Sequence, residues 1–353
     1  MLTTHVENGR AGKLHRDGYA ALSDYSRPLP LAVQPDCPFL VPGARLAAHN
    51  SDMLTSAFVN QGYQEGATQM ETRLVGRSIE VIIAPDKPTV IIGERINPTG
   101  KKRLAAAILA GDMKVVQRYA KDQVAAGADI IDVNVGAAGA DEAKLLPEAV
   151  QAVAEVVEVP VSIDSAKAAA LEAALKVAPG RPLVNSVNGE ERSLSEILPL
   201  VKEFHVPVVA LCMDDNGIPP TAEGRLAVAR KIAERAEALG IGLEDLLVDC
   251  LALTCSSDQT APSITLEAMR MVRCELGVNL TLGASNVSFG LPDRELLNGV
   301  FLGLAIQAGL NAPIVDAEKV RPYILAADLL LGKDEWGMRY IMAYRQRQAA
   351  AQE

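Results

Sequence analysis

The sequence predicts an α/β protein, a (β/α)8 TIM barrel with an N-terminal extension. From residue 88 onward, short runs rich in Val, Ile and Leu alternate with longer stretches rich in Ala, Glu and Lys. Eight such runs fall within about 260 residues, the usual size of one such barrel. The chain is 49% hydrophobic but 4% aromatic, which suits helices packed on a buried parallel sheet. The alternative is an open doubly wound sheet, which normally carries a glycine-rich turn after its first strand, and Ile92–Asn97 is not one.

Residues 1–80 are expected to form the extension, which is partly irregular. Five prolines lie between residues 28 and 42, and apolar periodicity is weak in Met1–Asn50. Ser78–Ile82 could form a short strand that leads into the main domain.

The barrel is expected to span residues 81–340 and to be followed by a polar C-terminal tail, residues 341–353. Amphipathic patterns or stop residues predict helices between the strands. The predicted helices include Ala168–Val177, Leu194–Phe204, Leu226–Leu239 and Val320–Leu331. The predicted strands, in chain order, are Thr89–Glu94, Asp129–Gly136, Pro160–Ser165, Pro182–Ser186, Pro207–Met213, Asp245–Cys250, Asn279–Asn286 and Ala312–Asp316.

Charge and composition argue against several classes of partner. The formal net charge is −10 and no Lys/Arg run offsets it, so we expect no nucleic-acid partner. The most apolar long stretch, Leu296–Val315, contains polar residues and reads as a helix followed by a strand, so we expect no membrane span. Five scattered cysteines and a polar N-terminal stretch without a signal-peptide pattern indicate a reducing compartment, and we expect a cytoplasmic location.

Histidine chemistry is not expected in the barrel. Four His residues occur, and three of them lie in the extension. A His-centred triad or a His-rich metal site is therefore not predicted. Cys250 and Cys255 are the closest cysteine pair, but their spacing is not that of a zinc site, and we expect no metal there.

Polar residues close most of the predicted strands, at the barrel end where active sites lie. Buried Asp and Asn side chains offer hydrogen-bond acceptors together with amide donors, which suits a planar heterocycle with several N–H groups, such as a reduced pterin. The alternative is that some are helix caps or partners within the barrel layers. The candidates are Glu94, Asn97, Asp132, Asn134, Asp164, Asn185, Asp249, Ser285 and Asn286.

Six motifs resemble the methyltetrahydrofolate–corrinoid methyltransferases, whose signature also occurs in the pterin-binding domain of cobalamin-dependent methionine synthase. The resemblance covers about residues 80–340, and its more specific parts are Gly93–Gly100 and Ser285–Pro292. One residue departs from it: Cys250 stands where family members often carry Pro. The motifs are IIGERIN, DVNVG, SIDS, LVNS, LVDCL and GASNVSFGLP, in that order.

The resemblance implies a barrel that binds 5-methyltetrahydrofolate and moves its methyl group to or from a corrinoid (cobalamin) cobalt. Asp164, Asn185 and Asp249 would anchor the pterin ring, and Asn134 would support the same pocket. Asn286 would lie near N5, where its neutral amide can donate a hydrogen bond that strengthens as the amine leaves, which makes it our catalytic candidate. Substrate-binding roles are also expected for Asp132, Ser285, Glu94 and Asn97.

The corrinoid is expected to arrive on a separate protein. Corrinoid-binding domains of this system carry His in an Asp-x-His-x-x-Gly motif, and none of the four His residues has that context. A homodimer is expected from the resemblance.

Two other functions stay open. Dihydropteroate synthase shares the barrel and a pterin pocket, but its Ser-Arg-Lys is replaced here by Ala284-Ser285-Asn286, and its Gly-Gly-Glu-Ser-Thr-Arg run by DVNVGAAGAD. A non-catalytic folate-binding protein would keep the pocket without turnover, and the presence of Asn286 argues against it.

Overall fold

The computed structural model describes residues 70–350, and these residues contain a closed barrel of eight parallel strands. The strands run around the barrel in the order β10-β3-β4-β5-β6-β7-β8-β9, so each strand pairs with its neighbours in the chain and the last closes on the first. The predicted TIM barrel is therefore confirmed. The strands are β3 (Ile92–Ile96), β4 (Ile130–Asn134), β5 (Val161–Asp164), β6 (Leu183–Asn188), β7 (Val208–Leu211), β8 (Leu246–Asp249), β9 (Asn279–Gly283) and β10 (Ala312–Val315).

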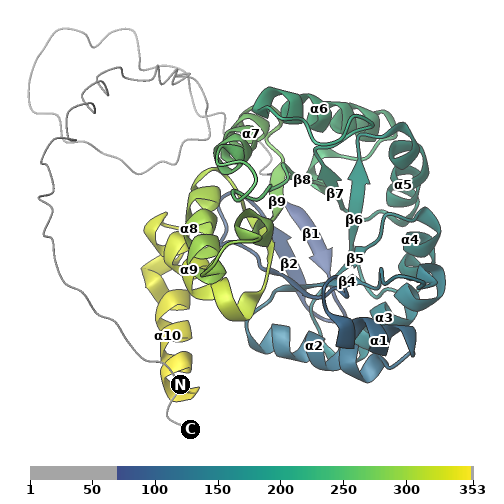
Figure 1. Ribbon diagram of the computed structural model, residues 1–353, viewed down its shortest axis with the longest axis horizontal. Coiled ribbons are helices and arrows are strands. Elements are labelled where there is room, and N and C mark those ends of the chain that lie inside the picture. The colour runs from purple at the N-terminus through teal and green to yellow at the C-terminus, as the bar shows by residue number, and fades with distance from the viewer. Residues whose placement is uncertain (1–69, 351–353) are drawn as a thin grey trace, which may run out of the picture. The chain divides into compact units, whose positions relative to one another are not determined.

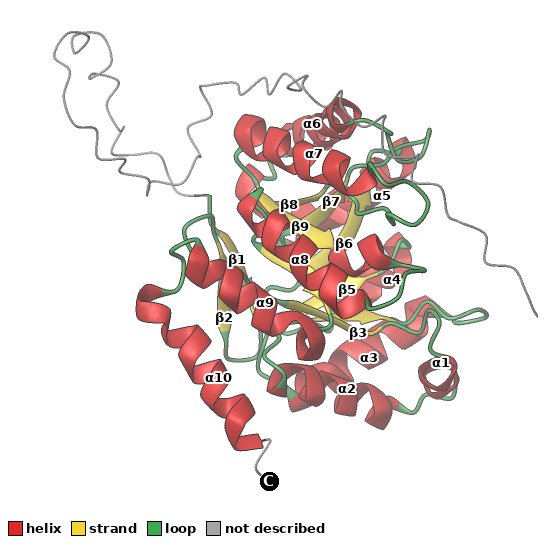
Figure 2. Cartoon of the chain, turned by 60° about the vertical axis from the view of Figure 1, so that its left-hand side comes forward, coloured by secondary structure: helices red, strands yellow, loops and turns green. Residues whose placement is uncertain are grey.

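Helices surround the strands in Figure 1, and Figure 2 shows the same helices outside the sheet. No described helix is both long and apolar enough to span a bilayer. The α-helices are α1 (Lys102–Leu109), α2 (Met113–Ala125), α3 (Glu142–Val156), α4 (Ala168–Leu175), α5 (Glu191–Phe204), α6 (Ala222–Ala238), α7 (Ala261–Leu276), α8 (Arg294–Gln307), α9 (Ala317–Leu330) and α10 (Met338–Ala350). Short 3-10 helices are η1 (Leu243–Asp245), η2 (Ala284–Ser288) and η3 (Glu335–Gly337).

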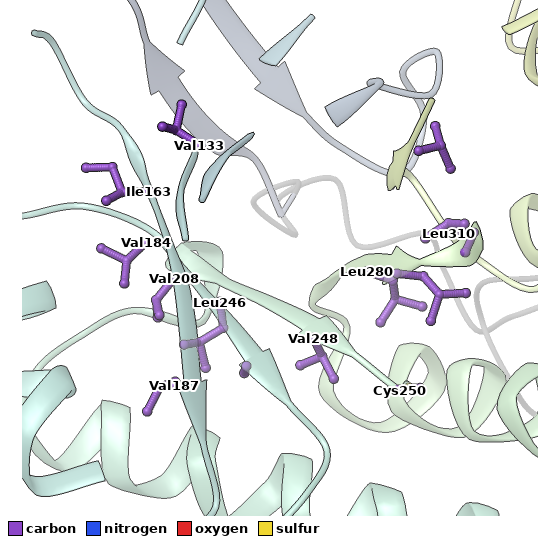
Figure 3. Close-up of a cluster of buried hydrophobic side chains, with 14 of the residues drawn as sticks. Val133, Ile163, Val184, Val187, Val208, Leu246, Val248, Cys250, Leu280 and Leu310 are labelled. Atoms are coloured by element: carbon purple, nitrogen blue, oxygen red, sulfur yellow. The ribbon is translucent and has the colours of Figure 1, made fainter. Parts of the chain in front are cut away.

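The main hydrophobic core lies between the strands and this ring of helices. Alternate strand residues such as Val133, Ile163 and Val208 are fully buried there (Figure 3). Burial of one such side chain stabilises the fold by roughly 1.5–3 kcal/mol. Because strand residues alternate between faces, the neighbours of these residues point into the barrel.

A second, smaller core fills the N-terminal end of the barrel interior. It combines inward-facing strand residues with Leu74 and Ile83, which come from a two-stranded hairpin of β1 (Thr72–Val75) and β2 (Glu80–Ile83). Leu74 and Ile83 are 0% exposed, so the hairpin closes this end of the barrel. Their partners in this core include Ile92, Ile130, Leu183, Val209 and Leu247.

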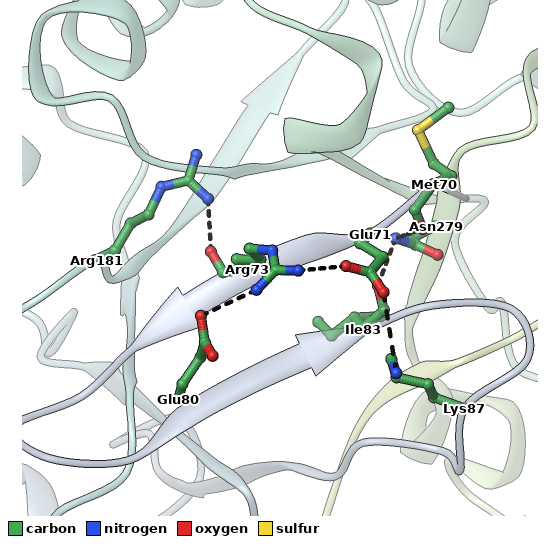
Figure 4. A network of polar contacts seen from close by, with 8 residues as sticks. All are labelled: Met70, Glu71, Arg73, Glu80, Ile83, Lys87, Arg181 and Asn279. Carbon is green, nitrogen blue, oxygen red and sulfur yellow. Dashed lines mark hydrogen bonds and ion pairs between the residues drawn. The ribbon is translucent and has the colours of Figure 1, made fainter. Parts of the chain in front are cut away.

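Asn279 at the start of β9 anchors the hairpin through its side-chain amide. Its Nδ2 donates to the carbonyl oxygens of Met70 and Ile83, at 3.1 and 2.9 Å, and to Oγ1 of Thr72 at 2.9 Å. Figure 4 shows Asn279 with Met70 and Ile83, together with Arg181, whose guanidinium donates to the carbonyl oxygen of Arg73 at 2.6 Å. A buried polar residue thus satisfies backbone groups that the barrel floor would otherwise leave unpaired.

The structure refines four expectations about the bounds of elements. The expected strand Ser78–Ile82 is β2, displaced slightly, and β1 lies within the segment expected to be an extension. The expected strand Asn279–Asn286 ends at Gly283, because the chain turns into η2. Helix α10 occupies most of the expected polar tail. Residues 1–69, which carry most of the predicted extension, lie outside the described residues.

Candidate functional site

The inward faces of several strands change from apolar to polar toward the C-terminal end of the barrel. Each polar residue stands two positions after an apolar residue of the barrel floor, and a period of two keeps both on the same face. A buried apolar floor therefore lies beneath a polar mouth. The pairs are Ile92 and Glu94, Ile130 and Asp132, Leu183 and Asn185, and Leu247 and Asp249.

Asp132 on β4 is held by side chains from the next two strands. Its Oδ1 accepts hydrogen bonds from Oγ of Ser162 at 2.7 Å and from Nδ2 of Asn185 at 3.1 Å. The side chain is 3% exposed. Burial raises the pKa of Asp132 well above its usual value, and the charge of Asp164 raises it further.

Asp164 ends β5 beside this group. Its Oδ2 accepts from Nδ2 of Asn134 at 2.9 Å, while Oδ1 of Asn134 accepts from the backbone N–H of Gly136. Burial raises the pKa of Asp164 to about 6, although hydrogen bonds from Asn134 and with Asp132 oppose the shift. Asp132, Asn134, Asp164 and Asn185 thus form one connected group at the ends of β4, β5 and β6.

Asp249 ends β8 and is 4% exposed. Its carboxylate accepts from the backbone N–H groups of Leu251, at 2.7 Å, and Gly283, at 3.2 Å. Burial raises the pKa of Asp249 to about 6 against these two bonds. Among the described residues, neither Asp132, Asp164 nor Asp249 forms an ion pair.

Glu94 lies on an irregular part of β3, where the register with β4 shifts between Gly93 and Ile96. The N–H of Arg95 donates to Oε1 of Gln123 on α2, at 2.7 Å. Gly93 leaves room for this contact, because a β-carbon there would lie 2.6 Å from the same oxygen. Burial raises the pKa of Glu94, and a 2.7 Å hydrogen bond from Ser285 to its Oε1 opposes the shift.

Asn286 lies on η2 and is exposed, and its side-chain amide has no hydrogen-bond partner among the residues described. It lies next to the Asp249 site, because a β-carbon at Gly283 would come to 3.3 Å from its Nδ2. Arg294 on α8 fixes the turn by donating to the carbonyl oxygen of Ser285 at 2.7 Å and to Oγ of Ser288 at 3.0 Å. The side-chain amide of Asn286 therefore lies on a turn that Arg294 fixes by hydrogen bonds.

Asn97 has a local role in the structure. Its Oδ1 accepts from the backbone N–H of Thr99 at 2.9 Å, in the turn between β3 and α1. Within residues 70–350 no hydrogen bond joins its side chain to the carboxylate group, so its part in binding stays a prediction.

Three residues that hold the site together were not predicted from the sequence: Ser162, Gln123 and Arg294. Ser162 stands two residues before Asp164 on the same strand face, so the period of two could have identified it. Gln123 and Arg294 act on backbone groups of distant segments, and no local pattern marks that role. No group of three or more His, Cys, Asp or Glu side chains arranged to hold a metal ion occurs in residues 70–350.

Comparisons with known proteins identify the family of the chain. Residues 93–316 match the family described as pterin binding enzyme. The chain is 34% identical to methionine synthase of Mycobacterium tuberculosis (strain ATCC 25618 / H37Rv) over 252 residues, which are 68% of this chain and 21% of that protein. It is 31% identical to methylcorrinoid:tetrahydrofolate methyltransferase of Eubacterium limosum over 265 residues, covering 73% of this chain and 96% of that protein. The chain therefore spans about a fifth of the methionine synthase and nearly all of the methyltransferase.

Solved structures show the same fold. Dihydropteroate synthase of Yersinia pestis, in complex with a pterine–sulfa conjugate, superposes with a TM-score of 0.56 at 19% identity. The match covers 73% of this chain and 98% of that one. At this identity the similarity speaks for the barrel alone.

Proposed function

Because the chain belongs to the pterin-binding enzymes, in the methyltetrahydrofolate–corrinoid methyltransferase family, we propose that it transfers a methyl group between N5 of 5-methyltetrahydrofolate and a corrinoid. The corrinoid would be carried by a separate protein, and its cobalt would give or accept the methyl group. The similarity to a methylcorrinoid:tetrahydrofolate methyltransferase over 96% of its length supports this reaction.

One observation carries the proposal: the buried carboxyl groups of Asp132, Asp164 and Asp249 form no ion pair within residues 70–350. A buried carboxylate without a cation or sufficient hydrogen bonds is costly, and this cost raises the pKa of Asp164 and Asp249 to about 6. A pterin ring would supply what is missing, because its amino-pyrimidinone edge offers neutral N–H donors. We therefore assign ring binding to Asp164, Asn185 and Asp249, with Asn134 and Asp132 holding the first two in place.

Asn286 is assigned the catalytic hydrogen bond to N5. A tertiary amine is a very poor leaving group, so its departure requires electrophilic help at nitrogen. The amide of Asn286 is neutral and has no hydrogen-bond partner within residues 70–350, so it can donate without first breaking a bond there. Ser285 and Glu94 would support the turn that carries it, because they hydrogen-bond each other.

The test uses the purified chain with 5-methyltetrahydrofolate and Co(I) cobalamin, either free or bound to a corrinoid protein. We expect saturable folate binding by calorimetry and growth of the methylcobalamin absorption spectrum. Folate binding without any spectral change would support a non-catalytic binder. Product formation from a pterin diphosphate and aminobenzoate would support dihydropteroate synthase activity instead. The predicted homodimer and cytoplasmic location stay predictions.

A further inference from the structure

Arg225 is a buried cation close to the proposed folate site that the mechanism above does not use. It lies in the first turn of α6, which begins after a Thr221 cap, and it is 1% exposed. Its guanidinium donates to the carbonyl oxygen of Pro219 at 3.1 Å and to those of Cys250 and Leu251, both at 2.9 Å. It also donates to Oγ1 of Thr265 on α7 at 2.9 Å.

These contacts join the segments that follow two neighbouring strands. Pro219 lies in the connection after β7, whereas Cys250 and Leu251 directly follow Asp249 at the end of β8. Within the described part of the chain, Arg225 forms no ion pair with a carboxylate, so backbone carbonyl groups and a hydroxyl satisfy its charge. Burial of a charge without an ion-pair partner costs free energy. We therefore infer that Arg225 has a role beyond packing.

The peptide between Cys250 and Leu251 links Arg225 to Asp249. Its carbonyl oxygen accepts from Arg225, and its N–H donates to Oδ1 of Asp249 at 2.7 Å. In a trans peptide the carbonyl and N–H groups point in opposite directions. The planar, rigid peptide group therefore connects the guanidinium of Arg225 to the carboxylate of Asp249. Leu251 has φ of 61°, a left-handed conformation that is unfavourable for Leu and that must be held by contacts such as these.

We propose that Arg225 is a positioning residue for Asp249: it fixes the peptide whose N–H orients the carboxylate toward the folate ring. Hydrogen bonds in such a chain polarise one another, so the cation also favours the ionised carboxylate through the peptide. The charge of Arg225 lowers the pKa of Asp249 in opposition to burial, in agreement with this direction. This role rests on the proposed function, in which Asp249 binds the pterin ring.

The test is a double-mutant cycle on 5-methyltetrahydrofolate binding, measured by calorimetry on the full chain. R225M removes the charge and keeps a long apolar stem, and D249N removes the charge of the carboxylate. We expect R225M to weaken folate binding at least tenfold alone, and to add less than threefold in the D249N background, because both variants disrupt one linked unit. R225K keeps the charge but not the planar fork, and we expect it to lie between wild type and R225M.

Three controls keep the result interpretable. R273M removes another buried arginine, which donates to the carbonyl oxygens of Gly277 and Val278 before β9, and it should leave folate affinity within twofold of wild type. T265V removes one partner of Arg225 with little change in volume, and should weaken binding in the same direction if R225M does not fold. Melting temperatures show which variants remain folded.

The possible outcomes separate the positioning role of Arg225 from the proposed function. Fully additive effects of R225M and D249N, or affinity unchanged in R225M, R225K and T265V, would overturn the positioning role and leave the proposed function standing. If the wild-type chain itself binds no folate, the proposed function fails, and the role of Arg225 fails with it.

Discussion

Asn286 differs from the polar residues around it because its amide is unpaired in the described part of the protein, whereas the neighbouring carboxylates and amides bond to one another. Asn286→Ala should lower kcat by about 100-fold or more, the usual effect of losing one preorganised donor. The dissociation constant for folate should rise much less, because the bond is proposed to strengthen in the transition state. Single-turnover kinetics beside calorimetry would check this.

Asn286→Asp is the matched variant for that experiment. Its ionised carboxylate has nearly the same shape but cannot donate a hydrogen bond. It should therefore be as slow as Asn286→Ala. Equal losses in rate and in folate affinity for both variants would contradict the assigned role.

Folate binding should depend on the ionisation of Asp164 and Asp249. Burial raises the pKa of each to about 6, and the ring N–H groups need the ionised acceptors. Affinity should therefore rise as pH increases from 5 to 7.5, with a change of up to about tenfold per pH unit below the pKa for each required proton loss. Calorimetry at several pH values measures this; an Asp164→Asn variant should bind more weakly and show a shallower dependence.

At this scale the sequence predicts which residues are polar at strand ends, but not how they are held. The period of two brings Asp132, Asn185 and Asp249 to one face because each follows a floor residue on a short strand. Gln123 and Arg225 could not be predicted, because each bonds to backbone atoms of segments far along the chain. Only the closed barrel brings these atoms together.

Among the elements, the β1–β2 hairpin is anchored by the side chain of Asn279. Asn279→Leu keeps a similar volume but leaves Thr72 and the carbonyl groups of Met70 and Ile83 without their donor. Each buried unsatisfied group costs about 1–3 kcal/mol, so we expect the free energy of unfolding to fall by about 3 kcal/mol or more. Urea denaturation followed by circular dichroism provides the measurement.

The control lies on the hairpin itself. Arg73 forms exposed ion pairs with Glu71 and Glu80, and such pairs contribute little. Arg73→Ala should therefore change stability by less than about 1 kcal/mol. A similar loss in both variants would show that the anchoring bonds of Asn279 are not what holds the hairpin.

Elements were predictable where burial gives a simple pattern. The eight barrel strands are rich in apolar residues because helices cover one face and the barrel interior the other. Strand β1 has four residues of alternating burial and gave no such run, and it lies outside the barrel ladder. The predicted strand Asn279–Asn286 runs past the end of β9 at Gly283, because the backbone forms a 3-10 turn over Ala284–Ser288.

For the whole molecule, the buried carboxyl groups make stability depend on pH. Asp249 has a pKa of about 6 in the folded chain against the ordinary value of 3.8, so the folded state binds more protons between these values. Stability should therefore fall as pH rises from about 4 to about 6, by up to about 3 kcal/mol for this residue. Asp164 acts in the same direction.

Urea denaturation of the folate-free chain at pH 5 and pH 7.5 should show lower stability at the higher pH. An exposed group acts in the opposite direction at lower pH: the hydrogen bond from Arg77 lowers the pKa of Glu158 to about 2, so its contribution is lost as the solution becomes more acidic. The Asp249→Asn variant should show a smaller difference between pH 5 and 7.5. An identical difference in this variant would argue that other groups cause it.

The hairpin that closes the N-terminal end of the barrel also limits the routes by which ligands could reach the proposed site. Among the described residues, Leu74 and Ile83 fill the N-terminal end of the barrel, so under the proposed function folate and the corrinoid carrier would both have to approach from the C-terminal end. Under the proposed function, folate must bind before the corrinoid carrier docks, and folate cannot dissociate until the carrier has dissociated. The order of events would then follow from the architecture of the barrel.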